Sequence, residues 1–301
     1  MKTYILNLIT ILLFYNYAIA QTASNNDIKN MPSETILEIQ YGDDNNKVGL
    51  IKVAGGVGPT SFAIFENYVY VTDNVKERIL IFKDKVLYKI IENISANDIF
   101  LNQNNELFTV NIKENSIDIY STNFEFKNRI KLSVDCGLIS ELKIDSKNNV
   151  FFFLGQEQYV VFPINNSIVN SGKKKSDIEN YSISYVNRRE KGIILKNSTK
   201  QSIEIKKDKF TIGIDFLGID MSLNSYYRIY FFGSVINDKI LTQCEIRKYN
   251  SSLNLTGTFN LLDESDSPYI IKRSSIINND NSIYFMRATM DKLVIEKILT
   301  K

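Results

Sequence analysis

The sequence predicts an all-β fold, a six-bladed β-propeller of four-stranded antiparallel blades. Three observations support it: short apolar runs separated by polar clusters, no helical periodicity, and a unit that recurs along the chain. The unit recurs about every 40 residues, and a single blade of that size cannot bury both of its faces. We therefore expect the repeated blades to pack against one another in a ring.

The apolar runs have the composition of strands. They are rich in Ile, Val, Phe and Tyr, and clusters of Asn, Asp, Gly or Lys separate them, as in "ILEIQYG", "RILIFKD" and "NNVFFFL". Such runs bounded by turn-forming residues are typical of short strands. No window of about a dozen residues keeps an uninterrupted apolar stripe at helical spacing.

The repeat is clearest near the start of the chain. The stretch "YVYVTDNVKERILIF", residues 68–82, recurs as "ELFTVNIKENSIDIY", residues 106–120, and again around "NVFFFLGQEQYVVF". Weaker copies begin at Tyr181, Phe216 and Ser274. Together these copies give the predicted count of six units.

Two stretches carry a family resemblance. "GPTSFAIFENYVYVTDNVKERILIF" resembles a blade of NHL-type and related six-bladed propellers, and "YNSSLNLTGTF" resembles the outer hairpin of such a blade. In that family a strand ending in Asp precedes a tight loop, an Arg and an apolar strand. Lys76 stands where the family usually has Asn, and later units replace Asp73 with Asn111 and Phe153. The resemblance therefore implies the fold rather than a shared site.

The N-terminus has the pattern of a secretory signal peptide. Lys2 precedes an apolar core, residues 5–14, and the small residues Ala18 and Ala20 precede a cleavage point before Gln21. The apolar run is shorter than the roughly 20 residues of a membrane span. We therefore expect a secreted or periplasmic protein without a transmembrane span.

The remaining chain divides into a flexible leader, residues 21–33, and a single propeller domain, residues 34–301. The last unit contains "KLVIEKI", while "ETILEIQYG" and "GLIKVAG" precede the first full unit. Unpaired strand edges favour aggregation. The sequence therefore predicts that a strand from residues 34–53 pairs with the unit at 270–298 and closes the ring.

The charge balance gives no reason to expect a nucleic-acid partner. The chain has 36 basic and 34 acidic residues, and removal of residues 1–20 removes only Lys2, which changes the formal charge from +2 to +1. Proteins that bind nucleic acid usually have a basic face. Here the two signs are interspersed.

Several kinds of catalytic site are excluded by composition. The chain has no histidine, which removes Ser-His-Asp and Cys-His systems and histidine-ligated metals. Cys136 and Cys244 fall in nonadjacent units, so we do not expect them to pair directly, although export permits a disulfide. Phosphate-binding glycine loops and EF-hand loops are also missing from the sequence. No catalytic or cofactor-binding residue is predicted.

Four acids are candidates for a channel or loop site because they lie near the beginnings of units: Asp98, Glu141, Asp215 and Asp220. The innermost strand of each propeller blade lines the axial channel, where converging carboxylates can bind Ca²⁺ or act as a general acid and base. The alternative is that each acid serves a turn or the surface.

Asp73 and Arg78 are predicted to serve structure. We expect the Asp73 carboxylate to accept hydrogen bonds from amides of the following loop and to pair with Arg78, which fixes the turn between two strands.

Two classes of function remain. The first is a non-catalytic exported binding or scaffold protein for a protein, peptide or glycan ligand, because a ring of blades displays rigid loops. The alternative is a carboxylate- or Ca-dependent hydrolase or lyase that acts on a small substrate. Fold alone does not decide between them.

Overall fold

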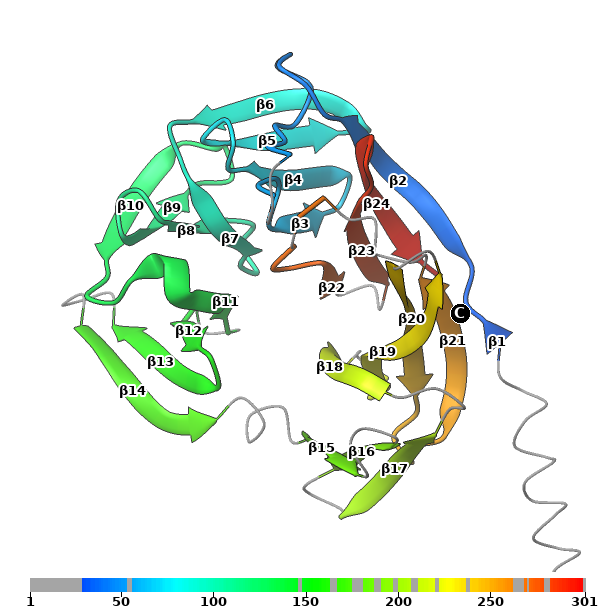
Figure 1. Cartoon of the computed structure of the whole chain (residues 1–301). Coiled ribbons are helices and arrows are strands. Elements are labelled where there is room, and N and C mark those ends of the chain that lie inside the picture. The colour runs from blue at the N-terminus through cyan, green and yellow to red at the C-terminus, as the bar shows by residue number, and fades with distance from the viewer. Residues whose placement is uncertain are drawn as a thin grey trace, which may run out of the picture.

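The computed structural model describes residues 29–52, 56–145, 148–162, 167–174, 181–186, 191–196, 200–206, 211–219, 222–236, 239–261, 268–269, 271–278 and 282–299. The expected signal peptide and Asp220 lie outside these residues. In the described part of the chain, six sheets stand side by side in a ring, as in a β-propeller (Figure 1).

Three consecutive four-stranded sheets form the first half of the ring. Each is a meander in which neighbouring strands run antiparallel. Their strands are β3 (Phe62–Phe65), β4 (Tyr68–Asp73), β5 (Arg78–Lys83) and β6 (Val86–Glu92); β7 (Ala96–Leu101), β8 (Leu107–Asn111), β9 (Ser116–Tyr120) and β10 (Phe126–Lys131); β11 (Ile139–Ile144), β12 (Val150–Leu154), β13 (Glu157–Phe162) and β14 (Ser167–Lys174). A single turn of 3-10 helix, η1 (Cys136–Leu138), precedes β11.

Two further sheets contain a four-stranded antiparallel set and draw strands from the N-terminal part of the chain. Their strands are β18 (Thr211–Ile219), β19 (Ser225–Ile236), β20 (Lys239–Tyr249) and β21 (Leu255–Leu261), with β1 (Lys29–Asn30) added parallel to β21; and β22 (Ser275–Ile277), β23 (Ile283–Ala288) and β24 (Lys292–Ile298), with β2 (Ser33–Gln40) added antiparallel to β24.

The remaining sheet has three described strands, β15 (Tyr181–Val186), β16 (Lys191–Lys196) and β17 (Gln201–Lys206). The prediction of six four-stranded blades is therefore wrong in its count, because five sheets have that form. Chain length explains the difference. Residues 84–95 separate β5 from β7 and include β6, whereas only residues 207–210 separate β17 from β18. An antiparallel fourth strand needs a turn of about two residues and a strand of about five.

The strands are apolar on both faces because each blade packs between two neighbours. On β4, Val69 and Val71 belong to a core shared with Ile295 of β24, while Tyr70 points to the other side and shares a core with Ile99 of β7. Successive side chains of a strand point to opposite faces, so a blade inside a ring needs apolar residues at both parities. This explains the near-continuous apolar runs in the sequence.

β2 lies where the sequence placed a closing strand. It pairs with β24 from Ser33 opposite Ile298 to Gln40 opposite Lys292. Its buried residues Leu37 and Ile39 enter the core between the first and last blades. The two ends of the described chain therefore complete one sheet together.

The last residues of the expected flexible leader have defined structure. Lys29 and Asn30 form β1, and the Met31 amide donates to the Thr258 carbonyl at 2.7 Å. Met31 is buried in the core between the β18–β21 and β22–β24 sheets. The expected leader, residues 21–33, is therefore too long at its C-terminal end. Met31 has an apolar side chain, and burial between the two sheets removes it from water.

Neither cysteine forms a disulfide in the structure: Cys136 and Cys244 are both buried free thiols. Tyr226 and Tyr227 of the aromatic run on β19 are fully buried and pack between sheets. Within the described residues, no helix has the length and apolar character to cross a lipid bilayer.

Candidate functional site

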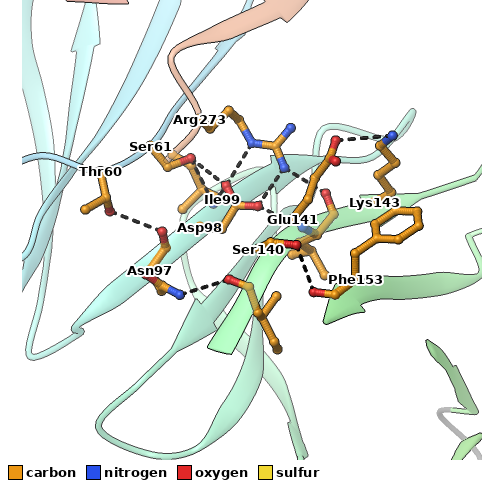
Figure 2. Close-up of polar contacts among 12 residues, drawn as sticks. Thr60, Ser61, Asn97, Asp98, Ile99, Ser140, Glu141, Lys143, Phe153 and Arg273 are labelled. Carbon is orange, nitrogen blue, oxygen red and sulfur yellow. Dashed lines mark hydrogen bonds and ion pairs between the residues drawn. The ribbon is translucent and has the colours of Figure 1, made fainter. Parts of the chain in front are cut away.

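Four residues from distant parts of the sequence are joined by hydrogen bonds, and Figure 2 labels three of them, Ser61, Asp98 and Arg273. Ser61 precedes β3, Asp98 lies on β7, Leu142 lies on β11, and Arg273 lies two residues before β22. We call these four residues the central cluster. The innermost strand of a blade, or the residue that leads into it, supplies each member, so closure of the ring brings them together.

Asp98 is the acceptor at the middle of the central cluster, and its side chain is 1% exposed. Its Oδ1 accepts hydrogen bonds from Ser61 Oγ at 2.7 Å, from Arg273 Nε at 2.8 Å and from the Ile99 amide at 3.0 Å. Its Oδ2 accepts from Arg273 Nη2 at 2.6 Å and from the Leu142 amide at 2.8 Å. These five hydrogen bonds occupy both oxygens of the carboxylate, which together offer only about four lone pairs.

Arg273 provides the balancing charge. Burial lowers the pKa of its guanidinium, but the Asp98 carboxylate, with a smaller contribution from Glu141, outweighs burial and raises the pKa above its ordinary value. Its Nη2 also donates to the Leu142 carbonyl at 2.8 Å, and its Cζ lies 5.7 Å from the centre of the Phe100 ring. Arg273 therefore remains charged and is held from several sides.

The residue before Arg273 adds further bonds from the same segment to two of these blades. The amides of Lys272 and Arg273 both donate to the Thr60 carbonyl, at 2.9 and 3.0 Å. Lys272 Nζ donates to the Gly137 carbonyl at 3.2 Å, and burial lowers the pKa of Lys272. The segment that leads into β22 is thereby bonded to the blades that begin with β3 and β11.

Glu141 lies beside the central cluster on β11. Its carboxylate forms an ion pair with Lys143 at 3.2 Å, and Lys143 Nζ lies 5.3 Å from the centre of the Phe153 ring. The pairing of β11 with β12 shifts register between Ile139 and Glu141, where Ser140 Oγ donates to the Phe153 carbonyl at 3.1 Å. Glu141 and Asp98 therefore come together around Arg273 (Figure 2).

Asp215 makes its ion pair within another sheet. It lies on β18 with a side chain 51% exposed, and Arg228 of β19 donates to it at 3.0 Å. Arg228 also donates to Ser274 Oγ, next to Arg273. The fourth candidate acid, Asp220, lies outside the described residues.

The central cluster does not have the chemistry of a calcium site. Ca²⁺ takes six to eight oxygen ligands, several of them carboxylates. Asp98 already has five donors on its carboxylate and a guanidinium as counter-charge. In the described part of the chain, no three His, Cys, Asp or Glu side chains are grouped so as to hold a metal ion.

Asp73 and Arg78 form a buried ion pair at the turn between β4 and β5, with 3.0 Å between Asp73 Oδ2 and Arg78 Nε. The backbone amide that donates to Asp73 Oδ1, at 3.0 Å, belongs to Gly49 rather than to the loop that follows Asp73. Arg78 Nη2 donates to the Lys47 carbonyl at 2.7 Å. The pair therefore anchors the N-terminal connection as well as the hairpin.

Asp118 is an equivalent residue that the sequence reading missed. Its buried carboxylate on β9 accepts from Arg129 Nε at 2.7 Å, from Ser116 Oγ at 2.8 Å and from Asn111 Nδ2 at 2.8 Å. The available signal was an acid inside the apolar strand "SIDIY". A buried acid at that position needs hydrogen-bonding partners.

Comparison with solved structures shows the fold. The chain is similar to a member of the DUF4221 family from Bacteroides vulgatus, with 9% identity, 90% of this chain and 98% of that chain covered, and a TM-score of 0.53. It is also similar to a structural genomics protein of unknown function from Bacteroides thetaiotaomicron, with 10% identity, 89% and 76% covered, and a TM-score of 0.50.

The chain is a β-propeller. Virginiamycin B lyase from Staphylococcus aureus is also similar, with 12% identity, 90% of this chain and 100% of that chain covered, and a TM-score of 0.46. Identities this low concern the fold and not the chemistry, and the lyase similarity carries no argument about activity. No protein-family model and no curated protein matches the chain.

Proposed function

We propose that the chain is an exported, non-catalytic β-propeller that binds a protein, peptide or glycan ligand. The supporting observation is that each described candidate acid is held in an ion pair: Asp98 with Arg273, Glu141 with Lys143, and Asp215 with Arg228. Each of these acids is thus engaged by a basic side chain of the same chain. A hydrolase that works with two carboxylates needs both of them free to reach the substrate.

The turn η1 is the ligand contact we propose, because it displays an apolar side chain on a fixed loop. Leu138 is 68% exposed. Hydrogen bonds to its backbone carbonyls fix the loop. Asn97 Nδ2 donates to the Cys136 carbonyl at 3.1 Å and to the Ile139 carbonyl at 3.3 Å, and Lys272 Nζ donates to the Gly137 carbonyl. A preorganised loop loses little conformational entropy when it binds.

The finer architecture belongs to the same proposal. The repeats are of NHL type. Residues 1–20 are a signal peptide, the leader ends before β1, and the mature protein is secreted or periplasmic. No cofactor is proposed, since Asp98 serves the central cluster.

The test is a binding screen of purified residues 21–301 on glycan and peptide arrays, followed by mass spectrometry of each bound compound after incubation. We expect recovery of the unaltered ligand. Leu138→Ser should weaken binding roughly tenfold, which corresponds to loss of one buried Leu side chain. Leu223→Ser is the matched control, because Leu223 is 65% exposed in the turn between β18 and β19. Conversion of the ligand to a product, abolished in Glu141→Gln, would contradict the proposal.

A further inference from the structure

Three aromatic side chains from two adjacent blades contact one another. Tyr68 begins β4, Tyr88 lies on β6, and Phe124 lies in the turn between β9 and β10. The ring centroids are 5.8 Å apart for Tyr68 and Tyr88, 6.1 Å for Tyr68 and Phe124, and 6.0 Å for Tyr88 and Phe124. Tilted and edge-on ring pairs at these separations attract each other. We call these three residues, with Lys83 and Lys89, the aromatic patch.

A β-bulge determines the position of Tyr88. Phe82 of β5 pairs with Leu87 of β6, and Ile81 pairs with Lys89, so Tyr88 is the extra residue between the two pairs. A bulge bends its strand and re-aims a side chain. The side chain of Tyr88 is 56% exposed and is therefore open to a ligand.

Phe124 has a backbone conformation that bulky residues rarely adopt. Its φ is 63°, in a turn where its amide donates to the carbonyl of Ser121 at 2.9 Å. Turns with the same hydrogen bonds have Asn105, Asn148 and Leu253 at this position. Asn tolerates the left-handed conformation, and Leu253 is buried in a core, but Phe124 is only partly buried. The preference of the turn therefore does not explain Phe124, whereas the contacts of its ring do.

Two ammonium groups lie over the rings of the aromatic patch. Lys83 Nζ is 5.1 Å from the centre of the Tyr68 ring and 5.8 Å from the centre of the Tyr88 ring. Lys89 Nζ is 5.4 Å from the centre of the Phe124 ring. At these distances the negative face of an aromatic ring attracts a cation. Each positive charge is thus held beside an aromatic surface.

The two lysines have no acid as partner. In the part of the chain that the structure describes, neither Lys83 nor Lys89 forms an ion pair with a carboxylate. Lys89 Nζ donates to the Asn123 carbonyl at 3.0 Å. Asp84, the acid between the two lysines in the sequence, accepts from Asn67 Nδ2 at 2.8 Å. The patch is therefore complementary to a ligand that has both an apolar face and negative charge.

We propose that the aromatic patch binds an acidic glycan, a chain that contains uronic acid residues. A pyranose ring has a face of C–H groups, which stacks on the negative face of an aromatic ring. A uronic acid also has a carboxylate at the edge of its ring, and this group forms charge-assisted hydrogen bonds with an ammonium group. Tyr88 supplies an exposed ring and Lys83 an ammonium group beside it, so one sugar unit uses both.

The aromatic patch is separate from the ligand contact proposed at η1. Phe124 lies before β10 and Leu138 lies after it, so the two sites are at opposite ends of this strand. The acidic-glycan site does not rest on the role proposed for Leu138, and either proposal can fail without the other.

An anionic lipid surface is the main competing partner, because aromatic and lysine side chains also collect at membrane interfaces. The bulge at Tyr88 and the turn at Phe124 fix the positions of the rings. Fixed positions reduce the entropy lost when a rigid sugar binds, whereas a fluid lipid surface adapts to its partner and does not need them. The structure therefore favours the glycan.

Isothermal titration calorimetry with purified residues 21–301 tests the proposal. The probes are hexamers of galacturonic, mannuronic, guluronic and glucuronic acid. We expect at least one hexamer to bind with a Kd in the micromolar to millimolar range and to bind less tightly as salt is added. The methyl ester of the same hexamer keeps the sugar rings but loses the charges, and it should bind roughly tenfold more weakly.

Two variants locate the site. Tyr88→Ala removes the exposed ring and Lys83→Gln removes an ammonium group, and each should weaken binding of the hexamer roughly tenfold. Phe162→Ala and Lys173→Gln are the matched controls, because Phe162 is 47% exposed on β13 and Lys173 is exposed on β14 of another blade. Both controls should bind as the parent does. Thermal melting shows whether each variant is folded, and if Tyr88→Ala melts early, Lys83→Gln still decides the question.

Several results would overturn the proposal. One is the absence of binding of every hexamer at millimolar concentration, and another is equal binding of the methyl ester. A third is an affinity that Tyr88→Ala and Lys83→Gln both leave unchanged. Vesicles of phosphatidylserine and phosphatidylcholine, and polyglutamate, are titrated alongside. Binding of either one without binding of a hexamer would assign the patch to a lipid surface or to an acidic peptide instead.

Discussion

Arg273 donates two hydrogen bonds to Asp98, although 175 positions separate the two residues in the sequence. Through this contact and its neighbours, the segment that leads into the last blade is joined to the blades that begin with β3, β7 and β11 (Figure 2). Asp98, which the sequence offered as a candidate for channel chemistry, thereby connects the blades through its hydrogen bonds.

The Asp73–Arg78 pair should contribute strongly to stability. Asp73→Ala leaves the Arg78 guanidinium buried without its counter-charge, and we expect the free energy of unfolding to fall by about 3 kcal/mol. Chemical denaturation followed by circular dichroism measures the change. Asp215→Ala is the control, because its half-exposed pair should contribute under about 1 kcal/mol. Equal losses in the two variants would show that burial does not set the value of these pairs.

Stability should fall in acid partly because of Asp118. Burial raises the pKa of this carboxyl, but hydrogen bonds from Arg129, Asn111 and Ser116 outweigh burial and lower the pKa below 3.8. Asp118 therefore contributes stability above pH 3.8, and this contribution disappears as the pH falls through the lower pKa of the folded state.

Asp118→Asn provides the measurement for this acid effect. We expect the variant to be less stable than the parent at neutral pH and to lose less stability between about pH 4 and pH 2. Urea unfolding at a series of pH values gives both quantities. If the two proteins lost the same unfolding free energy between about pH 4 and pH 2, other carboxyls would account for the loss.

Met31 should mark the start of the folded domain. Deletion of residues 21–28 leaves β1 and Met31 in place, and we expect an unchanged melting temperature. Met31→Ala empties a buried position between two blades and should lower the free energy of unfolding by about 2 to 4 kcal/mol. Differential scanning calorimetry distinguishes the two variants. A Met31→Ala protein as stable as the parent would show that Met31 does not contribute to the stability of the folded domain.

Closure of the ring by β2 should be essential for folding. A protein without residues 21–53 lacks β2 and exposes both the edge of β24 and the core that Leu37 and Ile39 cover. We expect it to aggregate or to fold poorly. Size-exclusion chromatography and melting curves test this, and a monomeric product with the parent's melting transition would contradict the closure.

Local sequence patterns were sufficient for the strands and the ring, because each strand packs on both faces and carries the apolar pattern itself. The number of complete blades was not predicted correctly, because the weakest repeat lies where the chain is too short for a fourth strand. The role of Asp98 was also missed. Its main partner, Arg273, is far away in the sequence, and only closure of the ring brings the two together.

The most direct test of the account is a double-mutant cycle between Asp98 and Arg273. Unfolding free energies are measured for the parent, Asp98→Ala, Arg273→Ala and the double variant, together with binding to a ligand from the arrays. We expect each single change to cost about 3 to 5 kcal/mol and the double change to cost much less than the sum, because each single change leaves a buried charge unpaired. Additive losses of under about 1 kcal/mol each, with turnover of a substrate abolished in Asp98→Ala, would contradict a structural role for Asp98.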